Sequence, residues 1–188
     1  MTIRNLEYLF KPRSIAVIGS GKKSQDPDVT LEFNLIEGGF KGPVMPVNPD
    51  HQSVSGVLAY KDIDSLPVTP DLAILTTPLD RAPALIGQLG ARGTKAALLL
   101  TREVLQDHRG TRPALLSPEL QRNYPDDGEA LKRKTLEAAK PYLLRVMGPD
   151  HLGYVVPSTH VNASLIGNRS LPGHIALLCQ SAAVMRSV

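Results

Sequence analysis

The stretch SIAVIGSGKK, residues 14–23, decides the fold class of this chain. Residues 15–19 carry no polar side chain, which predicts a strand buried on both faces, as in a parallel sheet. The Gly-Ser-Gly turn that follows, with a helix expected soon after it, presents free backbone N–H groups where an anion can sit. The stretch therefore predicts a nucleotide- or phosphate-binding α/β domain whose ligand lies beside this turn.

Known phosphate-binding patterns are only partly met by this turn. The dinucleotide fingerprint requires G-x-G-x-x-G, and the chain has Gly19 and Gly21 but no third glycine in residues 22–26. The G-x-x-x-x-G-K-[ST] pattern is absent. The turn alone leaves ligand binding and an ordinary strand-to-helix turn equally open.

Strands and helices are expected to alternate along most of the chain. In chain order they are a short helix (4–12), a strand (15–19), a helix (29–37), a short strand (42–49), a strand (71–78), a helix (80–92), a strand (95–101), a helix (129–140) and a strand (143–147). This is the βαβ alternation of a Rossmann-like, doubly wound parallel sheet. Pro43 and Pro46 favour a strand end or an edge strand over a long central strand, because proline cannot donate to a sheet ladder.

Three segments depart from this alternation. Residues 102–128 are polar and rich in turn formers, so we expect an insertion that forms a mobile surface loop. Residues 158–173 are irregular and are interpreted as a linker. The apolar residues 174–180 predict a sixth strand, followed by the start of a helix. We therefore expect a Rossmann-like domain over 1–157 and, over 174–188, the beginning of a second α/β domain in a truncated fragment.

Composition and charge exclude several classes of protein. The 188 residues include 42% hydrophobic residues and no Trp, which fits an α/β protein with a proper core. Net charge is +3 and the basic residues are dispersed, so we expect no nucleic-acid partner. The single Cys179 excludes an intramolecular disulfide and fits a reducing compartment. No stretch approaches the roughly 20 apolar residues that cross a bilayer, and no signal peptide is visible. We therefore expect a cytoplasmic protein without a membrane partner.

Candidate binding residues follow the predicted strands. Ligands of open α/β sheets bind beyond the carboxyl ends of the strands. The first strand ends at Gly19, the second at Asn48, the third at Thr77 and the fifth at residues 148–150. The glycines and prolines at these ends fix tight loops and let a ligand approach the backbone. Together these ends predict a cleft at one edge of the sheet.

Segments spread over nearly the whole chain resemble the N-terminal coenzyme A-binding domain of three related groups. These are the succinyl-CoA synthetase alpha subunit, the ADP-forming acyl-CoA synthetases, and the bacterial protein lysine acetyltransferases with an acyl-CoA-synthetase-like region. The segments are LFKPRSIAVIG (9–19), GPVMPVNP (42–49), LPVTPDLA (66–73), GPDHLG (148–153), NASL (162–165) and QSAAV (180–184). The last, where synthetases usually have Ser-Gly, is most similar to the acetyltransferase group.

The resemblance implies a Rossmann-like domain that holds coenzyme A (CoA) or acetyl-CoA along its strand ends. The turn after the first strand would take a phosphate, and the loops after the second and third strands would flank the nucleotide and the pantetheine. The implied binding residues are Gly19, Ser20, Gly21, Lys22, Lys23, Val47, Asn48, Pro49, Thr77, Pro78, Leu79 and Asp150, the last standing where the family usually has Asn. Lysines beside a helix N-terminus would attract the phosphates of CoA.

The implied function is a CoA- or acyl-CoA-binding module of a larger synthetase or acetyltransferase. Its partners would be further domains of the same protein and, as a homo-oligomer, further copies of the chain. We expect neither a metal site nor catalysis in these residues, because no histidine has metal-ligand spacing and none matches the phosphorylated histidine of the synthetases. Two alternatives stay open. One is an NAD(P)-binding redox or sensory module, with Asp50 after the second strand. The other is a degenerate regulatory domain without ligand, which the acidic Asp26, Asp28 and Asp150 favour.

Overall fold

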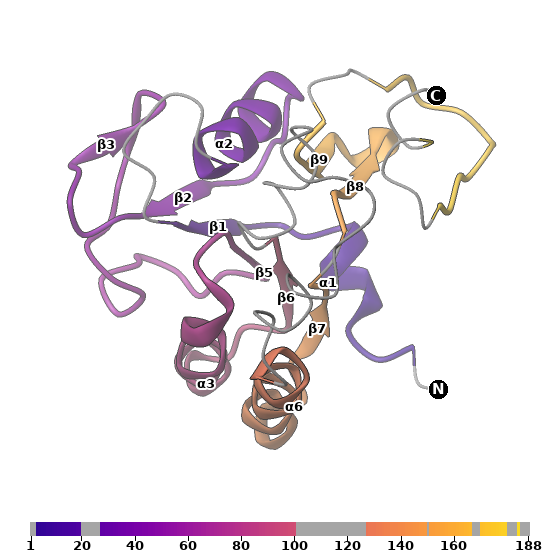
Figure 1. The fold of residues 1–188 in the computed structure, drawn as a ribbon. Coiled ribbons are helices and arrows are strands. Elements are labelled where there is room, and N and C mark those ends of the chain that lie inside the picture. The colour runs from indigo at the N-terminus through magenta and orange to yellow at the C-terminus, as the bar shows by residue number, and fades with distance from the viewer. Residues whose placement is uncertain are drawn as a thin grey trace, which may run out of the picture.

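A five-stranded parallel sheet forms the centre of the molecule, with strand order β2-β1-β5-β6-β7 (Figure 1). The computed structural model describes residues 3–19, 27–100, 127–149, 151–166, 170–179 and 184. The strands of the sheet are β1 (Ile15–Ile18), β2 (Val44–Val47), β5 (Leu72–Leu75), β6 (Ala96–Leu99) and β7 (Arg145–Met147). Every residue of β1, β5 and β6 is buried, as the apolar runs predict for strands covered on both faces. The predicted doubly wound parallel fold is confirmed.

Helices cover both faces of this sheet (Figure 1). On one face, α3 (Ala82–Arg92) and α6 (Asp127–Ala139) contribute residues such as Ile86 to a core that includes Leu75. On the other face, α1 (Leu6–Phe10) and α2 (Pro27–Glu37) pack with Ile74. Successive residues of a strand thus face opposite cores, which is the period of two expected for a sheet. Short 3-10 turns, η1 (Leu79–Arg81) and η2 (Lys140–Tyr142), lead into α3 and follow α6.

The edge position predicted for β2 is also confirmed. Pro46 lies within β2, and its carbonyl accepts a hydrogen bond from Tyr60 N–H at 2.8 Å on the outer side. The connection between them is a hairpin that the sequence analysis missed, β3 (Ser53–Val54) and β4 (Val57–Leu58). Ser55 and Gly56 have φ of 50° and 79° between these strands, which is the conformation of the two-residue turns that join hairpins.

A second hairpin shows that part of the segment 158–173, predicted to be irregular, has regular structure. β8 (Gly153–Val156) and β9 (Val161–Ser164) pair in antiparallel fashion and are joined by η3 (Pro157–Thr159). All four residues of β9 are buried. Its polar side chains bond to one another, because Ser164 Oγ donates to Asn162 Oδ1 at 2.6 Å. The polar side chains of β9 can therefore be buried, because they satisfy each other.

The β8–β9 hairpin also binds the amino-terminal helix. The Tyr154 hydroxyl donates to the Leu9 carbonyl, and Thr159 Oγ1 donates to the Phe10 carbonyl at 3.1 Å. The Phe10 and Tyr154 rings meet edge to face with centroids 5.5 Å apart. Burial raises the pKa of Tyr154, so its hydroxyl stays protonated and able to donate. Nearby, Asn5 Nδ2 donates to the Leu143 carbonyl at 2.9 Å. The beginning of the chain is thus held by residues from its last third.

The strand predicted over 174–180 is not formed in the structure. Residues 174–179 have no regular secondary structure, and Ile175 and Leu178 are 98% and 92% exposed. An apolar run becomes a strand only when a neighbouring strand completes its hydrogen bonds, and none of the described strands lies beside it. Of the predicted insertion, residues 102–126 lie outside the described residues, and α6 already begins at Asp127.

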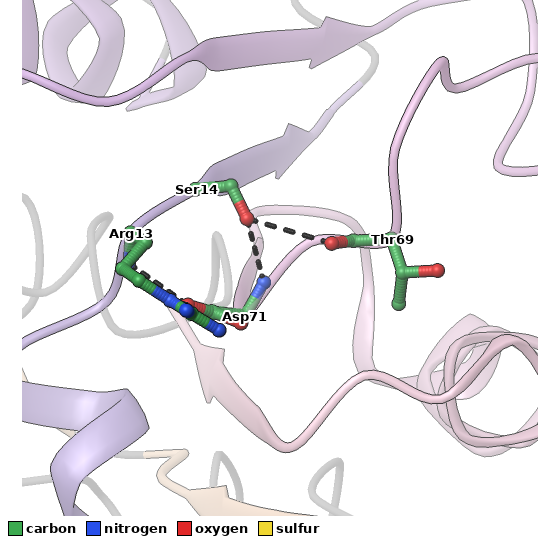
Figure 2. Close-up of polar contacts among 4 residues, drawn as sticks. All are labelled: Arg13, Ser14, Thr69 and Asp71. Carbon is green, nitrogen blue, oxygen red and sulfur yellow. Dashed lines mark hydrogen bonds and ion pairs between the residues drawn. The ribbon is translucent and has the colours of Figure 1, made fainter.

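The amino ends of β1 and β5 are joined by the polar network shown in Figure 2. The backbone N–H and Nε of Arg13 donate to Asp71 Oδ2 at 2.9 and 3.2 Å. Ser14 Oγ donates to the Thr69 carbonyl at 3.4 Å and accepts the Asp71 N–H at 3.0 Å. These bonds fix the register in which the two central strands begin.

Candidate functional site

The strand order identifies one place where a ligand is expected. The chain enters the sheet at β1, adds β2 on one side, and then crosses to add β5 on the other side. The order of connections therefore reverses between β1 and β5, and open α/β sheets bind ligands beyond the carboxyl ends of such a strand pair. We define the carboxyl edge as the last residue of β1, β2, β5 and β7 together with the residues that follow each strand. It is the candidate site.

Backbone hydrogen bonds continue past the ends of the central strands. Thr76 donates to the Ile18 carbonyl with its N–H at 3.0 Å and with its Oγ1 at 3.3 Å. Gly19 N–H donates to the Val47 carbonyl at 3.4 Å. Gly19 and Thr76 are both buried. The first residues beyond β1 and β5 are therefore fixed in position before any ligand arrives.

Thr77, the next residue, has a buried hydroxyl without a partner. Thr77 is 6% exposed, and its Oγ1 has no hydrogen-bond partner among the described residues. A buried polar group left unpaired costs about 1–3 kcal/mol, so such groups in native structures call for an explanation. Sequence reasoning placed Thr77 at this edge, but no sequence signal reveals that its hydroxyl is unpaired.

The loop after β2 is shaped by its own polar side chain. Asn48 is 3% exposed, and its Oδ1 accepts the Asp50 N–H at 2.9 Å, the geometry of an Asx turn. The Asn48 N–H donates to the Tyr60 carbonyl at 2.8 Å. Val47 is buried, whereas Pro49 and Asp50 are exposed. The Asn48 amide oxygen therefore holds the loop in its shape.

The loop after β7 packs closely against the end of β6. Gly148 has a φ of +105°, and a Cβ there would lie 2.5 Å from the Leu99 carbonyl oxygen and 2.9 Å from His151 Nε2. Glycine is thus required both by backbone conformation and by close approach. His151 Nδ1 accepts the Gly153 N–H at 2.8 Å, so this histidine supports the loop.

The predicted binding residues divide into two groups. Ser20, Gly21, Lys22, Lys23 and Asp150 lie outside the described residues, and their contacts with a ligand stay predictions. The remaining seven lie on the carboxyl edge. They are Gly19, Val47, Asn48, Pro49, Thr77, Pro78 and Leu79. The register of the sheet pairs Ile18 with Val47 and with Leu75, so the loops that follow these strands are neighbours. Their role in binding also stays a prediction.

A cavity of about 270 Å³ lies elsewhere, between α2 and the β8–β9 hairpin. It is lined by Phe33, Asn34, Glu37, Gly38, Val155, Pro157, His160, Val161, Asn162, Ser170, Leu171 and Pro172. None of the predicted binding residues is among them. Asn34 Nδ2 donates to the Ser164 and Ile166 carbonyls at 2.8 and 3.2 Å, so this amide joins α2 to the hairpin.

Within the described ranges, no three histidine, cysteine or acidic side chains gather in a way that would hold a metal ion. The helices of the described part of the chain are all too short or too polar to cross a membrane.

Known proteins include relatives whose sequences match most of this chain. The alpha subunit of acetate–CoA ligase [ADP-forming] I from Pyrococcus furiosus is 27% identical over 184 residues, which cover 96% of this chain and 36% of that protein. Acetate–CoA ligase [ADP-forming] II from Archaeoglobus fulgidus is 28% identical over 152 residues, covering 81% of this chain and 20% of that protein. The chain thus spans only about a third or less of the curated relatives that it matches.

Solved structures give the same architecture. PH0766 from Pyrococcus horikoshii OT3 is similar with a TM-score of 0.76 and 27% identity, over 95% of this chain and 37% of that one. The dinucleotide forming acetyl-coenzyme A synthetase 1 of Ca. Korarchaeum cryptofilum gives a TM-score of 0.67 and 27% identity, over 86% and 31% of the two chains. The family described as "CoA binding domain" matches residues 13–156. That range holds the whole sheet and its carboxyl edge, and the chain belongs to the CoA binding domain family.

Proposed function

We propose that this chain is a CoA- or acyl-CoA-binding module of a larger acyl-CoA synthetase-like protein or protein acetyltransferase. The observation that carries the proposal is the extent of the family match. Residues 13–156 contain all strands of the five-stranded sheet and the loops at its carboxyl edge. A sequence match that includes the strand ends supports a shared ligand site as well as a shared fold, because these ends are where such sheets bind ligands.

CoA would lie along this edge, across the ends of β2, β1 and β5. Its phosphates would bind the turn after β1, where Lys22 and Lys23 precede the N-terminus of α2. The loops at residues 47–49 and 77–79 would flank the nucleotide and the pantetheine arm. Asp150 would contact the ligand from the loop after β7.

Catalysis would belong to other parts of a longer protein. Both relatives described above are longer than this chain, since it covers 36% and 20% of them. The exposed apolar residues Ile175 and Leu178 support a strand that pairs in a second α/β domain, because an isolated apolar strand has no partner. The QSAAV segment at 180–184 favours an acetyltransferase over a synthetase. Acetyl-CoA is then the expected acyl ligand, and the single cysteine fits a cytoplasmic protein.

Isothermal titration calorimetry with CoA, acetyl-CoA, NAD and ATP in parallel tests this proposal. We expect micromolar binding of CoA or acetyl-CoA and no heat of binding with NAD. Binding of NAD alone would replace the proposal with a redox or sensory module. Absence of binding to all four ligands would contradict the proposal and favour a regulatory domain that has lost its ligand.

A further inference from the structure

Two asparagine amides lie in the wall of the cavity of about 270 Å³ between α2 and the β8–β9 hairpin. Asn34 comes from α2 and Asn162 from β9, and these elements lie side by side in Figure 1. The two residues are 6% and 8% exposed. Each amide carries donors and an acceptor, and burial makes an unpaired group costly. The partners of the two amides therefore show what the cavity offers to a ligand.

One half of each amide is used by the fold. Asn34 Nδ2 donates to the carbonyls of Ser164 and Ile166 at 2.8 and 3.2 Å. Asn162 Oδ1 accepts the Ser164 hydroxyl at 2.6 Å, and the oxygen of that hydroxyl accepts the Ile166 N–H at 3.3 Å. These bonds fix the orientation of both amides. The remaining groups are the carbonyl of Asn34, an acceptor, and the amino group of Asn162, a donor.

The other half of each amide has no protein partner. Among the described residues, no hydrogen bond reaches Asn34 Oδ1 or Asn162 Nδ2. Neither atom is fully enclosed, so both touch accessible space, and the cavity is the space that both side chains line. A fixed acceptor and a fixed donor are therefore available to one ligand, and their orientation is set before it binds.

The rest of the lining is suited to an apolar, uncharged molecule. Six of the twelve lining residues have apolar side chains, among them Phe33, Val155 and Leu171. Phe33 and Leu171 are 58% and 87% exposed, so a ligand could cover apolar surface that now contacts water. Glu37 also lines the cavity, whereas no lysine or arginine of the described ranges does. An anionic ligand is therefore disfavoured here, because no cation would compensate its burial.

We propose that this cavity is a second ligand site, which binds a small neutral molecule with a carboxamide on an apolar body. The N–H of the carboxamide donates to Asn34 Oδ1, its carbonyl accepts from Asn162 Nδ2, and its apolar body lies against Phe33 and Val155. A cavity of about 150 Å³ holds benzene, so 270 Å³ is enough for an aromatic amide. The site does not depend on CoA binding, because none of the predicted CoA-binding residues lines it.

Benzamide is the probe for this site. Its binding to the full chain is followed by ¹H–¹⁵N NMR, through the side-chain amide signals of Asn34 and Asn162. We expect a dissociation constant of about 1 mM, as is typical of so small a ligand, with shifts concentrated at the residues that line the cavity. Benzoate has a similar shape but carries a negative charge and has no N–H donor. It should bind at least about 10-fold more weakly.

Three variants locate the site, and thermal unfolding checks that each is folded. Asn162→Leu removes the free donor, so benzamide affinity should fall about 5-fold or more. The Ser164 hydroxyl keeps a second acceptor in this variant, the Ile166 carbonyl at 3.3 Å. Val155→Phe fills the cavity and should abolish binding. The matched control is Val68→Phe, at a residue that is 47% exposed and does not line the cavity, and it should bind as the wild type does.

Three results would overturn the proposal. Absence of shifts at the lining residues, at benzamide concentrations about twenty times the expected dissociation constant, would mean that the two amides bind water only. Equal affinity for benzoate and benzamide would exclude a site built for a carboxamide. Unchanged binding by Val155→Phe would place benzamide elsewhere on the molecule. Should Asn162→Leu fail to fold, the comparison of Val155→Phe with Val68→Phe still decides the location.

Discussion

The two ends of the strand pair β1 and β5 treat their polar groups in opposite ways. At the amino ends, the Ser14 hydroxyl is both donor and acceptor, and the Asp71 carboxylate accepts two hydrogen bonds from Arg13 (Figure 2). At the carboxyl ends, the Thr77 hydroxyl is buried and has no partner in the part of the chain that the structure describes, and the Arg81 N–H donates to the Pro78 carbonyl at 3.1 Å. The difference teaches that hydrogen bonds at the amino ends stabilise the fold, whereas the carboxyl ends are where we propose that the ligand binds. Substitutions at the amino ends should therefore change the free energy of unfolding, and substitutions at the carboxyl ends should change the affinity for CoA.

The largest effect is expected at Gly148, where both the free energy of unfolding and the affinity for CoA should change. In Gly148→Ala the new Cβ would lie 2.5 Å from the Leu99 carbonyl oxygen, in a backbone conformation with φ of +105°. We expect the free energy of unfolding to fall by about 3 kcal/mol and CoA affinity to fall with it, as measured by urea unfolding and calorimetry. Gly56→Ala is the control, because it has a φ of +79° but no atom within 4 Å of the new Cβ. It should lose about 1 kcal/mol and keep its affinity for CoA.

At the amino end, Asp71→Ala should reduce stability without touching ligand binding. The substitution removes the acceptor of the Arg13 N–H and Nε bonds, and we expect a loss of about 1–2 kcal/mol in urea unfolding. CoA affinity at a temperature where the variant is fully folded should equal that of the wild type. A clear loss of affinity would contradict the separation of the two ends.

Charge reversal at the turn after β1 should weaken CoA binding and leave stability nearly unchanged, the opposite of Asp71→Ala. Lys22→Glu combined with Lys23→Glu should weaken CoA binding several-fold and remove much of its salt dependence, because two cations near the phosphates become anions. Thermal stability should change little. The matched control is Lys11→Glu combined with Lys95→Glu, which alters net charge equally at two exposed residues that precede β1 and β6. Equal loss of affinity in both double variants would indicate a general effect of net charge instead of a local phosphate site.

The smallest effect is expected for Arg13→Ala. The Arg13 side chain is 85% exposed, so its ion pair with Asp71 is solvated and contributes less than about 0.5 kcal/mol. The backbone N–H of residue 13 still donates to Asp71 in this variant. Comparison with Asp71→Ala in urea unfolding therefore separates the main-chain bond from the ion pair, and similar losses in the two variants would contradict this assignment.

The sequence predicts the sheet well because buried parallel strands are apolar throughout, as residues 15–18 and 72–75 are. It fails at β9, where Asn162 and Ser164 are buried but satisfy each other, a pairing that only the folded chain reveals. The sequence also predicts a strand at residues 174–179 that does not form, because these apolar residues have none of the described strands beside them. The candidate edge follows from strand order alone, whereas the unpaired state of Thr77 depends on every neighbour and could not be predicted.

The hydrogen bonds between the segment around α1 and residues 143–159 have a consequence for the order in which the chain folds. Residues 4–10 make their bonds to Leu143, Arg145, Tyr154 and Thr159. During synthesis α1 is made about 140 residues before the residues to which it bonds. Closing so long a loop costs entropy that grows only slowly with length, about 0.6 kcal/mol per doubling. We therefore expect α1 to complete its contacts only once β8 and η3 are made, and a ribosome-bound chain stalled before β8 should leave α1 more open to proteolysis.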